Sequence, residues 1–220
     1  MLMNFWSEFL LIVVVHFMAV ASPGPDFAIV LRYAVRYGKK AALAASLGIG
    51  LAILLHVTYS LVGIGLLIKT TPWLYLTFSV VAAMYLAFLG IQALRSKAPA
   101  VKDAVEHERV EPTLSSRKAL LTGFITNGLN PKATLFFLSL FAVVISVDTP
   151  FHYKLVYGIY MAVATAAWFS LLSLVLTRAK VRGFLLLKGY WFDRVMGLLL
   201  LALALHLLYG STDNIGAIWS

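Results

Sequence analysis

Cysteine is absent from this chain of 220 residues, and charge is scarce, since Asp, Glu, Lys and Arg make up only 12% of it. The missing thiols exclude disulfide bonds and every cysteine-ligated metal site. About a quarter of the residues in a soluble domain are charged, whereas here 61% are hydrophobic. Together these features indicate an integral membrane protein.

Signatures of nucleotide-driven and hydrolytic chemistry are also missing. The sequence contains no Gly-rich phosphate loop, no His-Glu-x-x-His element and no Gly-x-Ser-x-Gly elbow. We therefore expect no ATP-driven pump, no catalytic residues, no metal and no cofactor. An intramembrane enzyme that uses Asp26 or a histidine as acid or base is an alternative, but no motif spacing supports it.

Six long apolar segments are present, approximately at 5–31, 41–68, 72–94, 119–147, 155–177 and 190–209. Each has at least the ~20 residues that a membrane-spanning helix needs. The first could be mistaken for a signal peptide, but the leading residues Met1 to Glu8 include an acid and no Lys or Arg, the reverse of a signal sequence. The prediction is an all-α membrane protein with six transmembrane helices.

The distribution of positive charge predicts the orientation of these helices. Most of the 18 basic residues lie in three connections, at 32–40, 95–118 and 178–194. By the positive-inside rule these connections face the cytoplasm of a bacterium, so that both termini lie on the periplasmic side of the inner membrane. The net charge of +9 then reflects topology and contact with anionic membrane lipids, not binding of nucleic acid.

Two of the predicted helices contain clusters of helix-breaking residues. The first holds Ser22-Pro23-Gly24-Pro25-Asp26-Phe27 and the fourth holds Asn127-Gly128-Leu129-Asn130-Pro131-Lys132. In each, a proline is followed by a charged residue and an apolar run, and each opens one half of three helices. The pattern predicts a single transmembrane domain over 1–220 built from two inverted repeats, at about 1–94 and 118–209, joined by a cytoplasmic linker at about 95–117.

The breaks also supply the candidate site residues. An ionisable side chain deep in an apolar helix is costly, so the default interpretation of Asp26 and Lys132 is functional. The alternatives are that the two only pair with each other or that Asp26 only caps a half-helix. Further candidates for substrate binding or proton coupling are the amides, the residues that shape the breaks and one histidine: Asn127, Asn130, Pro23, Gly24, Pro25, Pro131 and His16.

These motifs resemble the LysE/RhtB superfamily of bacterial amino-acid exporters. The family's Pro-Gly-Pro pattern is similar to Pro23-Gly24-Pro25-Asp26, and its Asn-Pro-Lys-Ala pattern is similar to Asn130-Pro131-Lys132-Ala133. His16, Leu120-Leu121-Thr122-Gly123 and Trp191-Phe192-Asp193 are similar to the threonine efflux branch. The resemblance implies secondary active export of threonine, with homoserine and related metabolites, by proton antiport. Many relatives carry asparagine in place of Asp26, a departure that bears on proton coupling.

Two non-enzymatic alternatives remain. A channel or passive facilitator for small zwitterions or ions would also have six spans and interrupted helices. A partner subunit without transport activity is a third interpretation, which buried charges in two matched breaks disfavour. Small residues on several helices would permit a homodimer.

Overall fold

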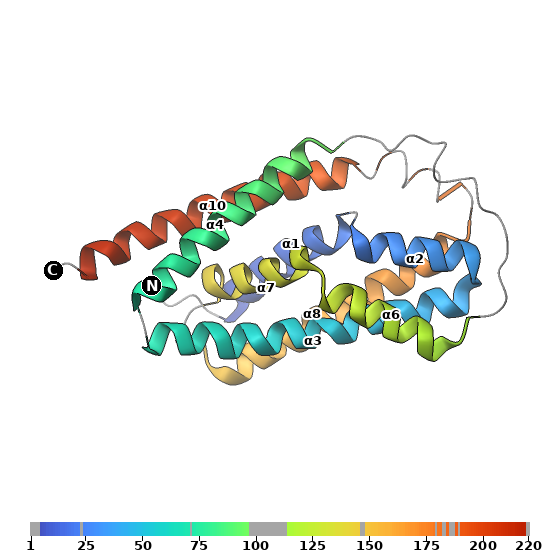
Figure 1. The fold of residues 1–220 in the computed structure, drawn as a ribbon, viewed down its shortest axis with the longest axis horizontal. Coiled ribbons are helices and arrows are strands. Elements are labelled where there is room, and N and C mark those ends of the chain that lie inside the picture. The colour runs from blue at the N-terminus through green and yellow to red at the C-terminus, as the bar shows by residue number, and fades with distance from the viewer. Residues whose placement is uncertain are drawn as a thin grey trace.

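A computed structural model describes residues 5–22, 24–70, 72–96, 114–145, 148–178, 180–181, 184, 188 and 190–218. All regular secondary structure in these residues is helical (Figure 1). The predicted linker at about 95–117 lies almost wholly outside this part of the chain, and so does Pro23. The all-α prediction is confirmed.

The first predicted helix is interrupted as expected. Helix α1 (Phe5–Ala21) ends before the breaker cluster, α2 (Pro25–Arg36) begins within it, and the two axes are bent by 55°. Pro25 stands in the first turn of α2, where its missing N–H has no helical partner to lose. The proline therefore starts a new helix where the preceding one stops.

The fourth predicted helix is interrupted in the same way. Helix α6 (Ser116–Gly128) ends at Gly128, and α7 (Pro131–Val143) again begins with a proline. The N-cap of α6 is Ser115, whose hydroxyl accepts a hydrogen bond from the backbone N–H of Lys118 at 3.3 Å. Both breaks therefore contain the start of a half-helix whose second residue is charged, Asp26 in α2 and Lys132 in α7.

The remaining long helices are α3 (Gly38–Thr70), α4 (Pro72–Leu94), α8 (Phe151–Val175) and α10 (Tyr190–Ile218). Most of the helices extend beyond the apolar segments that predicted them. The predicted end of the last helix, at 209, was wrong by nine residues, because α10 continues to Ile218. Apolar composition sets where a chain can lie in a membrane, whereas helix ends depend on capping and backbone hydrogen bonds.

Several of these helices suit a bilayer. By length and hydropathy, Gly38–Val62 and Phe151–Val175 can each cross a membrane, and the bent pair α1–α2 makes a third candidate among the described residues. Large apolar side chains lie on the outside of the bundle, for example Leu10, Phe88 and Ile159, each with more than half of its surface exposed. The chain is a multi-pass membrane protein.

Helix α3 lies against α6 with backbones in close approach. A Cβ atom added at Gly48 would lie 2.0 Å from the carbonyl oxygen of Leu120, and one added at Gly123 would lie 2.1 Å from that of Ala45. These distances leave no room for a side chain, so glycine at both positions permits the contact. The close contact fixes α6, and with it the second break, against a long continuous helix.

Helices α4 and α10 form a second close pair along one edge of the bundle (Figure 1). A Cβ atom at Gly90 would lie 2.9 Å from the carbonyl oxygen of Gly197, and a Cβ atom at Gly197 would lie 2.7 Å from that of Gly90. The contact is thus reciprocal. The pair has corresponding places in the two predicted repeats, as the third helix of each.

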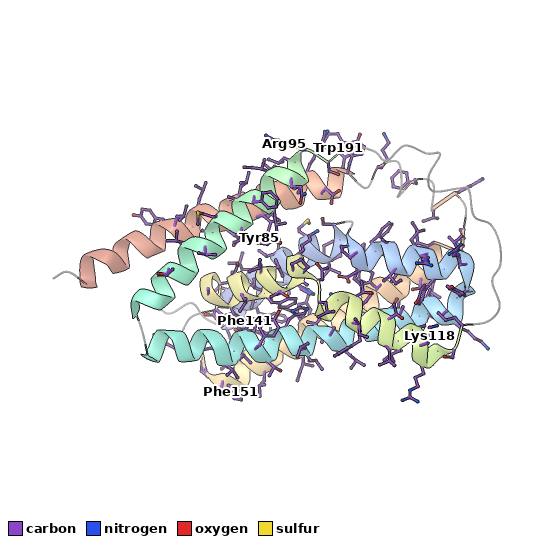
Figure 2. The ribbon with its side chains drawn as sticks, in the orientation of Figure 1. Tyr85, Arg95, Lys118, Phe141, Phe151 and Trp191 are labelled. Carbon is purple, nitrogen blue, oxygen red and sulfur yellow. The ribbon has the colours of Figure 1, made fainter. Side chains whose placement is uncertain are left out.

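The basic residues gather at one end of the bundle. The α2–α3 junction and the start of α6 lie at this end, and the start of α1 lies at the other end together with the end of α10 (Figure 1). Lys118 at the start of α6 and Phe151 at the start of α8 mark the two ends in Figure 2. We call the first of these the basic end; it holds Arg36, Lys39, Lys40, Arg117 and Lys118.

The close contact between α3 and α6 predicts a sharp difference between two glycines of α6. Gly123→Ala should destabilise the protein by about 1–3 kcal/mol, because the new methyl group must push against the backbone of Ala45. Gly128→Ala is the matched control, since its Cβ would meet only the side chain of Leu55 at 3.6 Å. Thermal unfolding of the purified proteins in detergent measures the difference, and equal melting temperatures for the two variants would contradict the packing described here.

Candidate functional site

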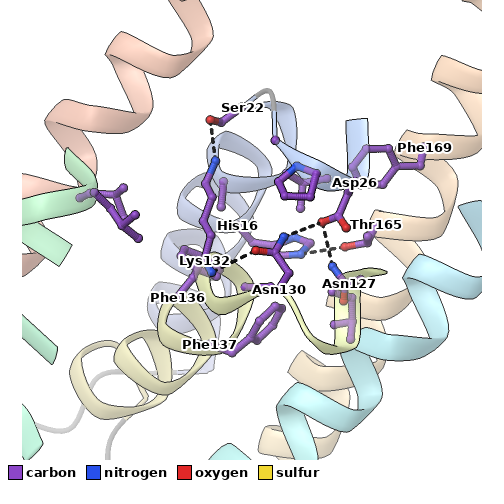
Figure 3. A pocket seen from close by; sticks show the side chains of 18 residues that line it. His16, Ser22, Asp26, Asn127, Asn130, Lys132, Phe136, Phe137, Thr165 and Phe169 are labelled. Carbon is purple, nitrogen blue, oxygen red and sulfur yellow. Dashed lines mark hydrogen bonds between the residues drawn. The ribbon is translucent and has the colours of Figure 1, made fainter. Parts of the chain in front are cut away.

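The two helix breaks meet at a cavity in the middle of the bundle (Figure 3). Helix α2 extends from it toward the basic end and α7 toward the opposite end, so that both half-helix N-termini face the cavity (Figure 1). Its space for water-sized molecules is about 50 Å³, enough for more than one. Polar groups from both breaks and from α1 and α8 line it: His16, Ser22, Asp26, Asn127, Asn130, Lys132 and Thr165.

Asp26 is held by both amides of the second break. Its Oδ2 atom accepts hydrogen bonds from Nδ2 of Asn127 at 2.9 Å and from Nδ2 of Asn130 at 3.4 Å. Its Oδ1 atom is buried and has no hydrogen-bond partner among the described residues, and the same is true of Oδ1 of Asn127. Two buried acceptors in one cavity are therefore available to a donor.

Lys132 approaches the cavity from the first turn of α7. Asn130 caps this helix, because its Oδ1 atom accepts from the backbone N–H of Lys132 at 3.0 Å. The side-chain ammonium donates to the hydroxyl of Ser22 in the first break at 2.9 Å. The hydrogen bonds of Asp26 and Lys132 thus go to other polar groups, and the alternative that the two charges only pair with each other is not what this geometry shows.

Helix α3 supports the second break through a histidine. His56 is fully buried, and its Nε2 atom lies 3.1 Å from the carbonyl oxygen of Asn127. Donation to that carbonyl requires a proton on Nε2, which leaves Nδ1 as the acceptor for the adjacent hydroxyl of Tyr59. The ring also stacks on Phe137 of α7, at an interplanar angle of 9°. His56 therefore holds both sides of the break.

His16 joins the cavity from α1. Its side chain is 1% exposed, and Nε2 lies 3.1 Å from the hydroxyl of Thr165 on α8. This hydrogen bond links the half-helix before the first break to a helix of the second predicted repeat. His16 and Thr165 thus form a neutral polar pair in a wall that is otherwise largely apolar.

Most of the site residues predicted from sequence lie together. The cavity lining includes seven of them: His16, Gly24, Pro25, Asp26, Asn127, Asn130 and Lys132. Pro131 begins α7 without lining the cavity, and Pro23 is outside the described residues. Their roles in binding and proton coupling remain predictions.

Sequence reasoning missed a second carboxylate next to the cavity. Asp193, in the first turn of α10, accepts hydrogen bonds from Ser22 and from Ser96, each at 2.7 Å. In the sequence it stood out only as part of Trp191-Phe192-Asp193, the stretch similar to the threonine efflux branch. The contact is made across 171 residues of sequence, so local pattern could not reveal it.

A third carboxylate was also missed. Glu8 is 1% exposed, and it accepts hydrogen bonds from the hydroxyl of Thr149 at 2.8 and 2.9 Å and from that of Tyr157 at 3.2 Å. In the sequence this acid served only as an argument against a signal peptide. The network instead joins α1 to the start of α8 at the end of the bundle opposite the basic end.

The cavity has one side that favours negative charge and one side that favours positive charge, so it is complementary to a small molecule that carries both. A helix N-terminus carries partial positive charge, which Asp26 matches at the start of α2. At the start of α7 the charged side chain is Lys132, so the ammonium adds to the positive end of the helix. The α7 side therefore favours an anion, and the unpartnered oxygens on the α2 side favour a cation. Within the described residues no group of His, Asp and Glu side chains could hold a metal ion.

Comparison with known proteins agrees with this architecture. Residues 17–211 match the family LysE, described as LysE type translocator. A threonine efflux protein of Escherichia coli (strain K12) is 31% identical over 208 residues, covering 91% of this chain and 97% of that protein. A threonine efflux protein of Salmonella typhi is 30% identical over 215 residues, covering 94% and 98%.

A leucine efflux protein of Salmonella choleraesuis (strain SC-B67) is 35% identical over a shorter stretch of 150 residues, which covers 67% of this chain and 66% of that protein. No solved structure matches the chain. The family match includes both helix breaks, and it begins within α1, at residue 17, and ends within α10, at residue 211. This chain therefore belongs to the LysE/RhtB family of translocators, in which it resembles the threonine efflux branch.

Proposed function

We propose that this protein is a secondary active exporter of small neutral amino acids, with threonine as the principal substrate and homoserine or related metabolites as others. Transport would occur by proton antiport across the bacterial inner membrane. The observation that carries the proposal is the central cavity, where two half-helix N-termini bring one acid, Asp26, and one base, Lys132, from the two breaks together. Half-helix ends of this kind form the ion and substrate sites of many secondary transporters.

A zwitterion fits the charges of this cavity. The ammonium group of an amino acid can donate to Oδ1 of Asp26 and Oδ1 of Asn127, both buried with no partner in the part of the chain that the structure describes. Its carboxylate can bind Lys132 at the positive N-terminus of α7. The acid and the base leave the cavity neutral overall, so a substrate with a further charged side chain would add an unpaired charge in a site of low dielectric.

The size and lining of the cavity support a small side chain. Phe136, Phe137 and Phe169 form part of the wall, and all three are nearly fully buried. The neutral pair of His16 and Thr165 offers a donor and an acceptor to a hydroxyl group. Threonine combines both features, and proteins named threonine efflux proteins are among the relatives.

Proton antiport would result from competition between a proton and the substrate ammonium for one oxygen atom of Asp26. Oδ1 of Asp26 can take a proton or pair with a substrate ammonium, but not both at once. A site that must release one to bind the other exchanges them, provided that it faces the two sides of the membrane in turn. Asp26 is suited to this role because its second oxygen is already fixed by Asn127 and Asn130, which keeps the carboxylate in place in both forms.

We also propose six membrane-spanning segments arranged as two inverted three-helix repeats, with the basic end in the cytoplasm and both termini in the periplasm. Two observations support the repeat: α2 and α7 both begin with a proline followed by a charged residue, and α4 and α10 meet through reciprocal glycines. Repeat 1 would comprise about 1–94 and repeat 2 about 118–209. The gathering of basic residues at one end supports the orientation.

A channel or passive facilitator is the main alternative, since it could use the same helix breaks. It would move substrate only down a gradient. The purified protein, reconstituted in liposomes with an imposed pH gradient, should accumulate labelled threonine above equilibrium, and homoserine should compete more strongly than lysine. Collapse of the gradient with an ionophore should abolish accumulation. Movement that only equilibrates threonine would identify a facilitator, and no movement by folded protein would reject transport of this substrate.

Loss of the Asp26 charge should uncouple the transporter. Asp26→Asn removes the titratable oxygen and the negative partner of the substrate ammonium, and hydrogen bonds to a charged group are worth about 1.5–3 kcal/mol. We expect threonine accumulation driven by the pH gradient to fall about tenfold or more, with membrane level and melting temperature retained. Asp148→Asn, an exposed acid outside the cavity, serves as the control for loss of one negative charge. Normal coupled export by Asp26→Asn would exclude Asp26 from the mechanism.

A further inference from the structure

A hydrogen-bonded cluster joins the first helix break to the α4–α10 pair. The carboxylate of Asp193 at the start of α10 accepts from Ser22 through Oδ1 and from Ser96 through Oδ2, each at 2.7 Å. Ser22 lies in the break between α1 and α2, and Ser96 lies just after α4. One carboxylate thus fastens three parts of the chain that are distant in sequence.

The same cluster is connected to the cavity through Lys132. The hydroxyl of Ser22 has one proton, which it donates to Asp193, and it accepts a hydrogen bond from the ammonium of Lys132 at 2.9 Å. An ammonium, a hydroxyl and a carboxylate therefore form a continuous chain. Charge-assisted hydrogen bonds of this kind are roughly twice as strong as neutral ones, so Asp193 stabilises the position of Lys132 through Ser22.

The cluster adjoins the cavity at Ser22. Ser22 lines the cavity, while Asp193 does not. Figure 3 shows Ser22 and the ammonium of Lys132 on the side of the cavity toward α4 and α10. Arg95 and Arg194 directly adjoin Ser96 and Asp193 in the sequence. The cluster thus lies on the side of the cavity toward the α4–α10 pair, next to these two basic residues.

The α4–α10 pair is closely packed within itself. Its two helices touch backbone to backbone at Gly90 and Gly197, whereas it is fastened to the first break through the polar contacts of Asp193. Apolar contacts are not directional, whereas a part-buried carboxylate loses hydrogen bonds when it leaves its donors. The hydrogen bonds of Asp193 are therefore the specific part of this attachment.

We propose that Asp193 is a gating residue, which with Ser22 and Ser96 latches the α4–α10 pair to the first helix break and closes the cavity toward the basic end. The proposal rests on the transport function proposed above only for the direction in which substrate moves. Release of the latch would let the α4–α10 pair swing away from Ser22 and open the cavity on the basic side. Closure on the opposite side would be unaffected, because Asp193 binds Ser22 and Ser96, which lie on the side toward α4 and α10.

The absence of cysteine from the chain allows a direct test without substrate. Ala133→Cys places one thiol in the cavity lining, and Lys118→Cys, in a separate protein, reports which face of a vesicle is the basic one. Labelling by a membrane-impermeant maleimide is timed from each face. Adding Asp193→Asn to Ala133→Cys should speed labelling from the basic face about tenfold, in keeping with the loss of charge-assisted hydrogen bonds, and should leave labelling from the opposite face unchanged. Ser96→Ala should act in the same direction by a smaller factor.

The matched control is Ser173→Ala, which removes another buried inter-helix serine contact, the 2.8 Å bond to Ser46 between α3 and α8. It should not change labelling from either face. Unchanged labelling in Asp193→Asn would overturn the latch, and so would faster labelling from both faces, since that would mean a general loosening of the bundle. Because no substrate is added, these outcomes are independent of the threonine accumulation experiment. Faster labelling from the basic face without threonine accumulation would reject the exporter and retain the gate. Threonine accumulation without faster labelling would retain the exporter and reject the gate.

Discussion

The polar contact between two interrupted helices is the constraint on which this structure depends. A break in a helix at membrane depth leaves amide and carbonyl groups that water cannot reach, so they need partners within the protein. At the second break, His56 binds the carbonyl of Asn127, and Oδ1 of Asn130 accepts from the backbone N–H of Lys132. The polar side chains of the two breaks bind each other, because Asn127 and Asn130 donate to Asp26 and Lys132 donates to Ser22, and the cavity lies where the breaks meet.

Close packing around the breaks makes this arrangement rigid. Helix α3 contacts α6 through Gly48 and Gly123 and contributes His56, which binds the carbonyl of Asn127 and stacks on the ring of Phe137. The helices on both sides of the second break, α6 and α7, are thus held against α3. Small residues permit the helices to approach, and the polar side chains then fix the register between them.

The polar groups of the chain are arranged in three layers along the bundle. Glu8 with Thr149 and Tyr157 lies toward one end, Asp26 with Lys132 lies in the middle, and Asp193 with Ser22 and Ser96 lies toward the basic side of α4 and α10. Each layer is centred on one carboxylate and joins elements from both halves of the chain. A transporter that opens alternately to two sides requires a central site between two closures. The layered arrangement is consistent with that requirement.

Local sequence was sufficient to predict the approximate positions of the helices, the two interruptions and the presence of Asp26 and Lys132 at them. These features arise from apolar runs, from proline, which lacks an N–H, and from the cost of charge at depth, all of which act over a few residues. The roles of His56, Glu8 and Asp193 were decided by tertiary structure. Each bonds to a group more than 70 positions away, and nothing in the residues around Asp193 distinguishes a buried acceptor from an exposed helix start. Whether a polar side chain near a helix end is solvated or acts as a contact depends on which distant backbone arrives beside it, and only the folded bundle determines that.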